Sequence, residues 1–456
     1  MSLIKSKFID FTGIPLGNVL ISGTAGENLN AGDICYLSND GKFYKANASM
    51  LSTSKGLLAI SSSSVSAGFI NIMILRGAYS TTGLLTGSEY WLDGDISGGK
   101  TPYKTSYNFS NVTKLPDPSV LPSGIGYGVS FSPSMTYLSV TCNSSPYIII
   151  YKRDGDTFTK LSNPSTLPTT LCYSIKWSFD ETYLATGSWN SPYIFIYKRS
   201  GDTFTKLSNP STLPPAYVRG VDWSPDMTYL ATAHYSSPYV TIYKRNGDTF
   251  TKLPDPSVLP TGDGKCIAWS PDMTYLVVGH ANSPYITIYK RNGDTFTKLP
   301  DPSVLPTEVA NGVSFSPDMT YLAVGHFGSP YVTIYKRNGD TFTKLPDPSV
   351  LPTGNGNGVA WSPDGTYLAV THITSPYLTI YKRNGDTFTK LPNPSVLPTG
   401  AGDETTFSPD GVYLVVCHDI SPYITIYKGS TVIRRSLGYA INDSVLFFNP
   451  DRYNGV

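Results

Sequence analysis

The sequence predicts an all-β protein in which a seven-bladed β-propeller is inserted in a small antiparallel β-domain. A fixed repeat is the main evidence, because the tripeptide Ser-Pro-Tyr recurs every 46 residues, seven times, from Tyr147 to Tyr423. A period of this size with several short apolar runs in each unit is typical of propeller blades. The content of 33 Tyr, 41 Gly and 36 Pro also suits short strands and tight turns rather than helices.

Each repeat is consistent with four antiparallel strands. In the fourth full unit, we expect them at Cys266–Ser270, Tyr275–His280, Tyr285–Arg291 and Thr295–Leu299, separated by turn residues. The segment SPDMTYLAVGH and the strand that follows it resemble a WD repeat. A tyrosine stands where that family usually has tryptophan in the third strand, and the usual Gly-His before the first strand is absent. The resemblance therefore implies a divergent, WD-like propeller.

The two ends of the repeat array complement each other. Residues 111–115 (NVTKL) copy a fourth strand before any complete blade, and the last unit stops after its third strand at 421–428. We therefore expect the final blade to take its outer strand from residues 108–115, which would close the ring and remove the sheet edges. This pairing would bring the ends of residues 108–428 together, as a tolerated domain insertion requires.

The remaining residues, 1–107 and 429–456, do not repeat. Their short apolar runs alternate with Gly, Asn, Asp and Ser, which indicates a small β-domain. AGENLNAGDICYLSNDGKFY (25–44), GLLTGSEYWL (83–92) and GYAINDSVLFF (438–448) resemble β-domains of bacteriophage head-decoration, head-fibre and tail-fibre proteins. The resemblance implies that 1–107 and 429–456 form one discontinuous domain, here called the carrier.

Composition argues against several classes of function. Charged residues make up 15% of the chain and the net charge is +1, which argues against nucleic-acid binding because phosphates require a basic surface. No apolar run is long enough for a membrane span, and the first residues lack the apolar core of a signal peptide. The five cysteines show no CxxC spacing. We expect no metal site, no cofactor and no disulfide framework.

The seven copies differ from one another mainly in two loops. The SPDMT and NGD turns are nearly constant, whereas the loop before the first strand and the loop between the second and third strands vary. In an up-and-down blade both variable loops lie on one face of the disc, so we predict a recognition face there. Sequence drift at unconstrained positions is the alternative. The candidate contact residues are Tyr127, Tyr173, Trp189, Tyr217, Arg219, Tyr235, Lys265 and Phe327.

Other recurring residues have structural interpretations. All five histidines share one repeat position, and neighbouring blades would hold them too far apart to ligate one metal ion, so we expect them to bond local turns. The aromatic residues that recur at the end of the first strand are expected between blades. An enzyme needs convergent catalytic groups, and the acids Asp222, Glu308, Asp403 and Glu404 belong to scattered blades. We therefore predict no enzymatic activity and no catalytic residues.

The resemblance of the carrier implies a non-enzymatic protein on the surface of a phage virion, made in the host cytoplasm. The carrier would bind other virion proteins of the capsid or tail, and the propeller would bind a host surface protein or glycan. A homotrimer is the default expectation for a phage fibre. Two alternatives remain open, namely a purely structural capsid-decoration protein and an intracellular propeller scaffold.

Overall fold

The computed structural model describes residues 106–432, 436–442 and 445–448, and before them the backbone of strands β1–β8; side chains are described for residues 108–430. All regular structure in these residues is β-strand. Within the described part of the chain, no helix has the length and apolarity to cross a membrane. The chain divides into two compact units, Met1–Tyr107 with Thr431–Val456, and Asn108–Ser430.

The first unit contains a ten-stranded sheet to which both ends of the chain contribute. Its main order is β4-β3-β5-β6-β38-β37-β7-β8, with β2 paired to β6 and β1 to β2. The C-terminal strands β38 and β37 thus pair antiparallel with β6 and β7, which precede the second unit in the sequence. The strands are β1 (Leu3–Ile4), β2 (Val19–Thr24), β3 (Ile34–Leu37), β4 (Phe43–Lys45), β5 (Leu58–Ser61), β6 (Ile70–Ser80), β7 (Glu89–Leu92), β8 (Lys100–Thr101), β37 (Ser436–Asn442) and β38 (Val445–Phe448).

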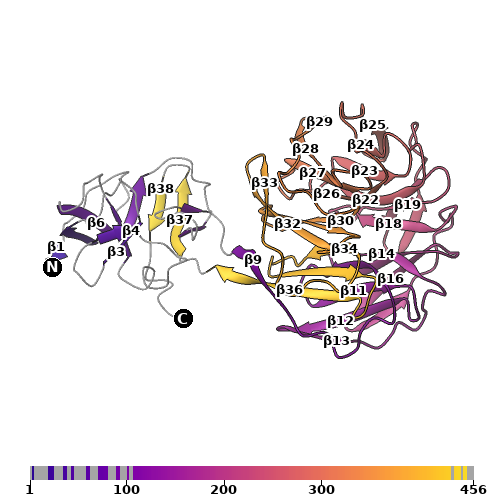
Figure 1. The fold of residues 1–456 in the computed structure, drawn as a ribbon, viewed down its shortest axis with the longest axis horizontal. Coiled ribbons are helices and arrows are strands. Elements are labelled where there is room, and N and C mark those ends of the chain that lie inside the picture. Colours follow the sequence, from indigo (N-terminus) through magenta and orange to yellow (C-terminus); the bar gives the residue numbers. More distant parts are fainter. Residues whose placement is uncertain are drawn as a thin grey trace. The chain divides into compact units, whose positions relative to one another are not determined.

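The second unit is a seven-bladed β-propeller, as predicted, with its four-stranded sheets arranged in a ring (Figure 1). Blades one to three are β10 (Gly126–Phe131), β11 (Tyr137–Cys142), β12 (Ile148–Asp154), β13 (Thr157–Lys160); β14 (Cys172–Trp177), β15 (Tyr183–Ser188), β16 (Ile194–Ser200), β17 (Thr203–Lys206); and β18 (Val218–Trp223), β19 (Tyr229–His234), β20 (Val240–Asn246), β21 (Thr249–Lys252). Blades four to six are β22 (Gly264–Trp269), β23 (Tyr275–His280), β24 (Ile286–Asn292), β25 (Thr295–Lys298); β26 (Ala310–Phe315), β27 (Tyr321–His326), β28 (Val332–Asn338), β29 (Thr341–Lys344); and β30 (Gly356–Trp361), β31 (Tyr367–His372), β32 (Leu378–Asn384), β33 (Thr387–Lys390).

The seventh blade closes the ring. Its order is β34 (Gly402–Phe407), β35 (Tyr413–His418), β36 (Ile424–Val432) and then β9 (Ser106–Lys114), which comes from the start of the unit. The Leu115 amide donates to the Ile426 carbonyl at 2.8 Å, and the Ser430 hydroxyl donates to the Asn108 carbonyl at 3.1 Å. This is the pairing that the copy NVTKL predicts, with a strand that begins a few residues earlier.

Burial follows the position of each strand in its blade. Every residue of the second strand is buried in all seven blades, whereas in the fourth strand of blades one to six only the phenylalanine is buried. The recurring aromatic residue of the first strand packs between blades, as expected. Trp177 stacks on Tyr137 of the preceding blade with ring centroids 5.5 Å apart. Such aromatic contacts add to the apolar area buried between neighbouring sheets.

The constant NGD turn is a contact between blades. The Tyr229 hydroxyl donates to Asp294 Oδ1 of the next blade at 2.5 Å, and Lys244 Nζ lies 2.7 Å from Asp294 Oδ2. The Arg291 guanidinium lies 5.5 Å from the centre of the Tyr229 ring. The same tyrosine–aspartate bond joins other neighbours, through Tyr137–Asp202, Tyr183–Asp248, Tyr275–Asp340, Tyr321–Asp386 and Tyr413–Asp156. The constancy of this turn therefore follows from packing.

The recurring histidines anchor the variable loop between the second and third strands. His326 Nδ1 lies 2.8 Å from the Phe327 carbonyl, and His326 Nε2 lies 2.9 Å from the Thr333 hydroxyl. His234 makes equivalent contacts, with its Nδ1 2.8 Å from the Ser236 carbonyl. Both ring nitrogens of each histidine are thus used inside its own blade, which fixes the start of the loop.

Blades one and two lack both members of the histidine–threonine pair. Cys142 and Ser188 occupy the histidine position, and Ile149 and Phe195 occupy the threonine position. Because both residues are replaced together, no buried imidazole nitrogen is left without a hydrogen-bond partner. Such an unpaired nitrogen would cost free energy. The two positions therefore behave as one unit.

Thr333→Ile alone is expected to lower the free energy of unfolding by about 1–3 kcal/mol, because His326 Nε2 loses its partner in a buried site. The double variant His326→Cys with Thr333→Ile copies blade one and is expected to recover part of this loss. Urea denaturation of the full chain measures both. A double variant less stable than the single variant would contradict the pairing.

Burial lowers the pKa of His234, His280 and His372 to about 4. The unfolded chain, with histidine pKa near 6.5, therefore binds more protons than the fold between pH 6.5 and 4. Stability should be intact above pH 6.5 and fall as the pH drops towards 4, by up to about 1.4 kcal/mol per pH unit for each histidine.

The comparison that isolates this effect is the urea midpoint at pH 7 and pH 4.5 for the native chain and for His372→Cys with Thr379→Ile. The variant has one buried histidine fewer and should lose less stability on acidification. Equal losses in the two proteins would show that His372 does not contribute.

Candidate functional site

The two variable loops lie side by side in every blade. The Trp189 amide donates to the Leu171 carbonyl at 3.1 Å, and the Tyr235 amide donates to the Tyr217 carbonyl at 3.2 Å. In the other blades the corresponding amide and carbonyl belong to Asn143 and Ile125, Ala281 and Asp263, Phe327 and Val309, Ile373 and Asn355, and Asp419 and Ala401. The variable positions of each blade therefore meet at the same end of the ring.

A β-bulge displays the second variable position of each inner strand. The pairing between the first and second strands is irregular at the residue that follows the start of the inner strand in all seven blades. A bulge redirects a side chain and leaves it outside the ladder. The residues at this position are Tyr127, Tyr173, Arg219, Lys265, Asn311, Asn357 and Asp403.

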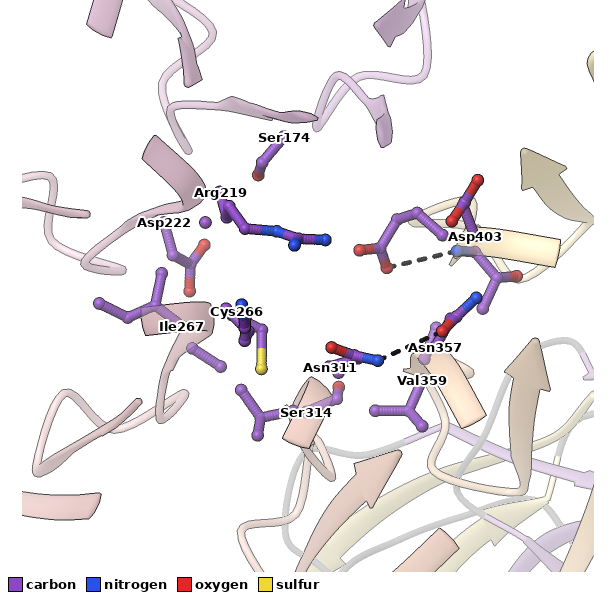
Figure 2. A pocket seen from close by; sticks show the side chains of 18 of the residues that line it. Ser174, Arg219, Asp222, Cys266, Ile267, Asn311, Ser314, Asn357, Val359 and Asp403 are labelled. Carbon is purple, nitrogen blue, oxygen red and sulfur yellow. Dashed lines mark hydrogen bonds between the residues drawn. The ribbon is translucent and has the colours of Figure 1, made fainter. Parts of the chain in front are cut away.

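All seven of these side chains line one cavity, of about 630 Å³, at the centre of the propeller. Figure 2 shows Arg219, Asn311, Asn357 and Asp403 around it. A second layer is formed by alternate residues of the inner strands, among them Lys176, Asp222, Cys266 and Glu404. No single repeat forms this site, because each of the seven blades contributes residues to its wall. We refer to this cavity as the channel.

Three of the predicted contact residues form a stack. The rings of Trp189 and Tyr217 lie 4.2 Å apart at 20°, and those of Tyr217 and Tyr235 lie 4.8 Å apart at 21°. Tyr217 is covered on both faces, whereas Trp189 and Tyr235 are 42% and 45% exposed. The outer two rings are therefore available to a partner, and Tyr217 supports them rather than offering a free face.

Tyr173 connects this stack to the channel. Its ring centre lies 6.2 Å from that of Tyr217 and 5.2 Å from that of Tyr127. The Arg219 guanidinium lies over the Tyr173 ring at 4.8 Å. Burial raises the pKa of both Tyr127 and Tyr173, so their hydroxyls stay protonated at neutral pH. Tyr127, Tyr173, Trp189, Tyr217 and Tyr235 are together called the aromatic cluster.

The other three predicted residues, Arg219, Lys265 and Phe327, lie on the channel wall outside this cluster. Lys265 Nζ is 3.7 Å from Asp263 Oδ2 of the same blade. Phe327 lines the channel together with Ile373 and makes no aromatic ring contact within residues 108–430. The predicted contact residues therefore lie on one face of the propeller. They form two groups there, the aromatic cluster and a separate group on the channel wall.

Three of the four acids noted in the sequence, Asp222, Asp403 and Glu404, line the channel although they belong to different blades. Burial raises the pKa of Asp222 to about 6 and that of Glu404 above its usual range, and the Lys176 charge opposes both shifts. Burial and then the Asp419 charge raise the pKa of Asp403 to about 7. Ring closure explains the proximity, because blades three and seven both face the channel.

Glu308, in contrast, is exposed at a loop.

Lys176 was not among the predicted site residues, although the sequence contains one indication of its role. The repeat position that it shares with Asp222 also changes from copy to copy, as Ser130, Lys176, Asp222, Ala268, Ser314, Ala360 and Thr406. Alternation along an inner strand directs this position to the same side as the residue two places before it.

Comparisons with known proteins support the fold. Residues 255–390, which contain blades four to six, match the family model of eukaryotic translation initiation factor eIF2A, over less than a third of the chain. No curated protein matches the sequence.

Solved structures are similar over the propeller. A chain of hydrazine synthase from Kuenenia stuttgartiensis has a TM-score of 0.55 and 14% identity, covering 70% of this chain and 99% of its own. A chain of a mitotic checkpoint complex has a TM-score of 0.52 and 18% identity, covering 71% and 94%. At these identities, the chain shares with both structures the propeller fold alone.

Proposed function

We propose that this chain is a non-enzymatic surface protein of a bacteriophage particle and that it binds a host-surface ligand at the channel mouth. One observation carries this proposal. In a propeller built from nearly identical repeats, the positions that differ gather at the aromatic cluster and the channel.

Exposed residues elsewhere in the propeller test the alternative that the channel residues vary through sequence drift alone. The third residue of the TFTK strand is an exposed threonine in blades one to six, identical in each, at Thr159, Thr205, Thr251, Thr297, Thr343 and Thr389. Unlike the NGD turn, these threonines have no side-chain hydrogen bond within the described residues. Drift would change them at least as readily as the channel residues, so the variation at the channel favours selection for binding.

The aromatic cluster has the properties of a binding anchor. Trp189 and Tyr235 are exposed, and stacking on Tyr217 restricts their motion before a partner arrives. Rigid exposed aromatic rings lose little conformational entropy on binding and dominate many interfaces. A glycan or a protein loop would both offer groups that pack on such rings.

The first unit supports attachment to a particle. Strands β37 and β38 pair with β7 and β6, as expected if 1–107 and 429–456 form one discontinuous carrier. The motifs that resemble phage head and fibre domains lie in these same residues. We propose that the carrier binds capsid or tail proteins at the virion surface, with a homotrimer as the default assembly.

A second candidate is an intracellular propeller scaffold, which the eIF2A match at 255–390 favours. That match covers three blades of repeated sequence and does not reach the non-repeating residues. A capsid-decoration protein without a ligand is a third candidate, and it leaves the variation at the channel unexplained.

The double variant Trp189→Ala with Tyr235→Ala tests ligand binding. Loss of two exposed anchors should weaken attachment of the full chain to ligand-bearing cells by about 30-fold or more, equivalent to about 2 kcal/mol. Fluorescently labelled protein and a panel of bacterial strains give the measurement. Thr159→Ala with Thr205→Ala is the matched control on the outer strands and should bind normally. Unchanged attachment of the aromatic variant would overturn the assignment of this face.

A further inference from the structure

Apart from Lys176 and Asp222, two oppositely charged residues of the second layer, the channel carries opposite charges on opposite walls. Arg219 and Lys265 come from the adjacent blades three and four, and Asp403 and Glu404 come from blade seven. Figure 2 shows the Arg219 side chain reaching into the open centre from one side, with Asp403 on the other side. The walls attract each other electrostatically, since the Arg219 charge acts on the Asp403 carboxyl.

Two of these charges, Arg219 and Asp403, are not neutralised by direct contact, whereas Lys265 Nζ lies 3.7 Å from Asp263 Oδ2. The Arg219 guanidinium packs on the Tyr173 ring and forms no hydrogen bond or ion pair within residues 108–430. The Asp403 carboxylate likewise accepts no hydrogen bond from a described residue. A charge in a partly desolvated site is costly unless an opposite charge or water compensates it. The open space between the walls is therefore suited to a ligand that compensates both.

Each wall also holds like charges close together. Burial and then the Arg219 charge lower the pKa of Lys265, while burial and then Asp419, with a smaller contribution from Glu404, raise the pKa of Asp403. A ligand anion beside the first wall and a ligand cation beside the second would relieve both repulsions. A ligand with a single charge would relieve one wall and be repelled by the other.

Amide groups complete the lining between the charged walls. Asn311 Nδ2 donates to Asn357 Oδ1 at 3.4 Å, and Asn357 Nδ2 donates to the Gly402 carbonyl at 2.9 Å. The Tyr127 and Tyr173 rings stand at the mouth on the remaining side. Aromatic rings beside amides suit the apolar faces and hydroxyl groups of a sugar.

We propose that the channel binds a zwitterionic sugar unit of the host-surface ligand, with its carboxylate against Arg219 and Lys265 and its ammonium group against Asp403 and Glu404. This proposal rests on the proposed function, because it names the chemical class of the ligand recognised at the mouth. The cavity of about 630 Å³ has room for more than one sugar unit, so the zwitterionic unit would be a terminal residue or a branch.

The test is isothermal titration of the full chain with muramic acid, a sugar that carries both an amine and a carboxylate. N-acetylmuramic acid lacks the positive charge and glucosamine lacks the negative charge, so the three form a matched series. Muramic acid should bind at least tenfold more tightly than either. Alanine is a zwitterion without a sugar ring, and equal binding of alanine would overturn the sugar assignment.

Two variants test separately how much each charged wall contributes to binding. Arg219→Gln and Asp403→Asn should each weaken muramic acid binding by tenfold or more, whereas Thr159→Ala on an outer strand should leave it unchanged. Equal binding of N-acetylmuramic acid and muramic acid, or no binding of any probe, would overturn the proposal.

The outcome separates this proposal from the proposed function. If the Trp189 and Tyr235 double variant loses cell attachment while muramic acid does not bind, recognition at the mouth stands and the zwitterionic ligand is wrong. If muramic acid binds and the double variant attaches normally, the ligand class stands and the aromatic cluster is not the attachment surface.

Discussion

The pairing of β9 with β36 is the constraint on which the rest of the second unit depends. Without it, the seventh blade would lack its outer strand and the ring would have an open edge. Closure also creates the channel, since Arg219 and Asp403 face each other only when blade seven returns to blade one. The site is therefore a property of the whole ring, and damage to either end of residues 108–430 should affect it.

A uniform framework supports a non-uniform site. Interblade bonds such as Tyr229 to Asp294, and the histidine–threonine pairs within blades, repeat with small changes round the ring. Against this background the bulge position changes from tyrosine to arginine, lysine, asparagine and aspartate. Changes at a bulge residue leave the strand ladder intact, because that residue lies outside it. This architecture allows the recognition surface to change without a loss of stability.

The repeat made most of the propeller predictable. The period located the blades, and the misplaced copy NVTKL indicated closure, because strand pairing is periodic and local in sequence. Comparison of copies also identified the loops that carry Trp189 and Tyr235. The stacking that covers both faces of Tyr217 depends on side-chain packing between blades, and no one-dimensional pattern contains it. The meeting of Asp222, Glu404 and Lys176 was missed for a similar reason, because it needs the ring geometry as well as the alternation of the inner strand.

We propose that the propeller is displayed on a phage particle, and immunogold labelling of intact particles with an antibody against residues 108–430 tests that proposal most directly. We expect label on every particle, at the tail or fibres if the protein binds the primary receptor and over the head if it decorates the capsid. Particles that carry no label, with the protein recovered only from the soluble fraction of infected cells, would contradict the proposal and favour an intracellular propeller.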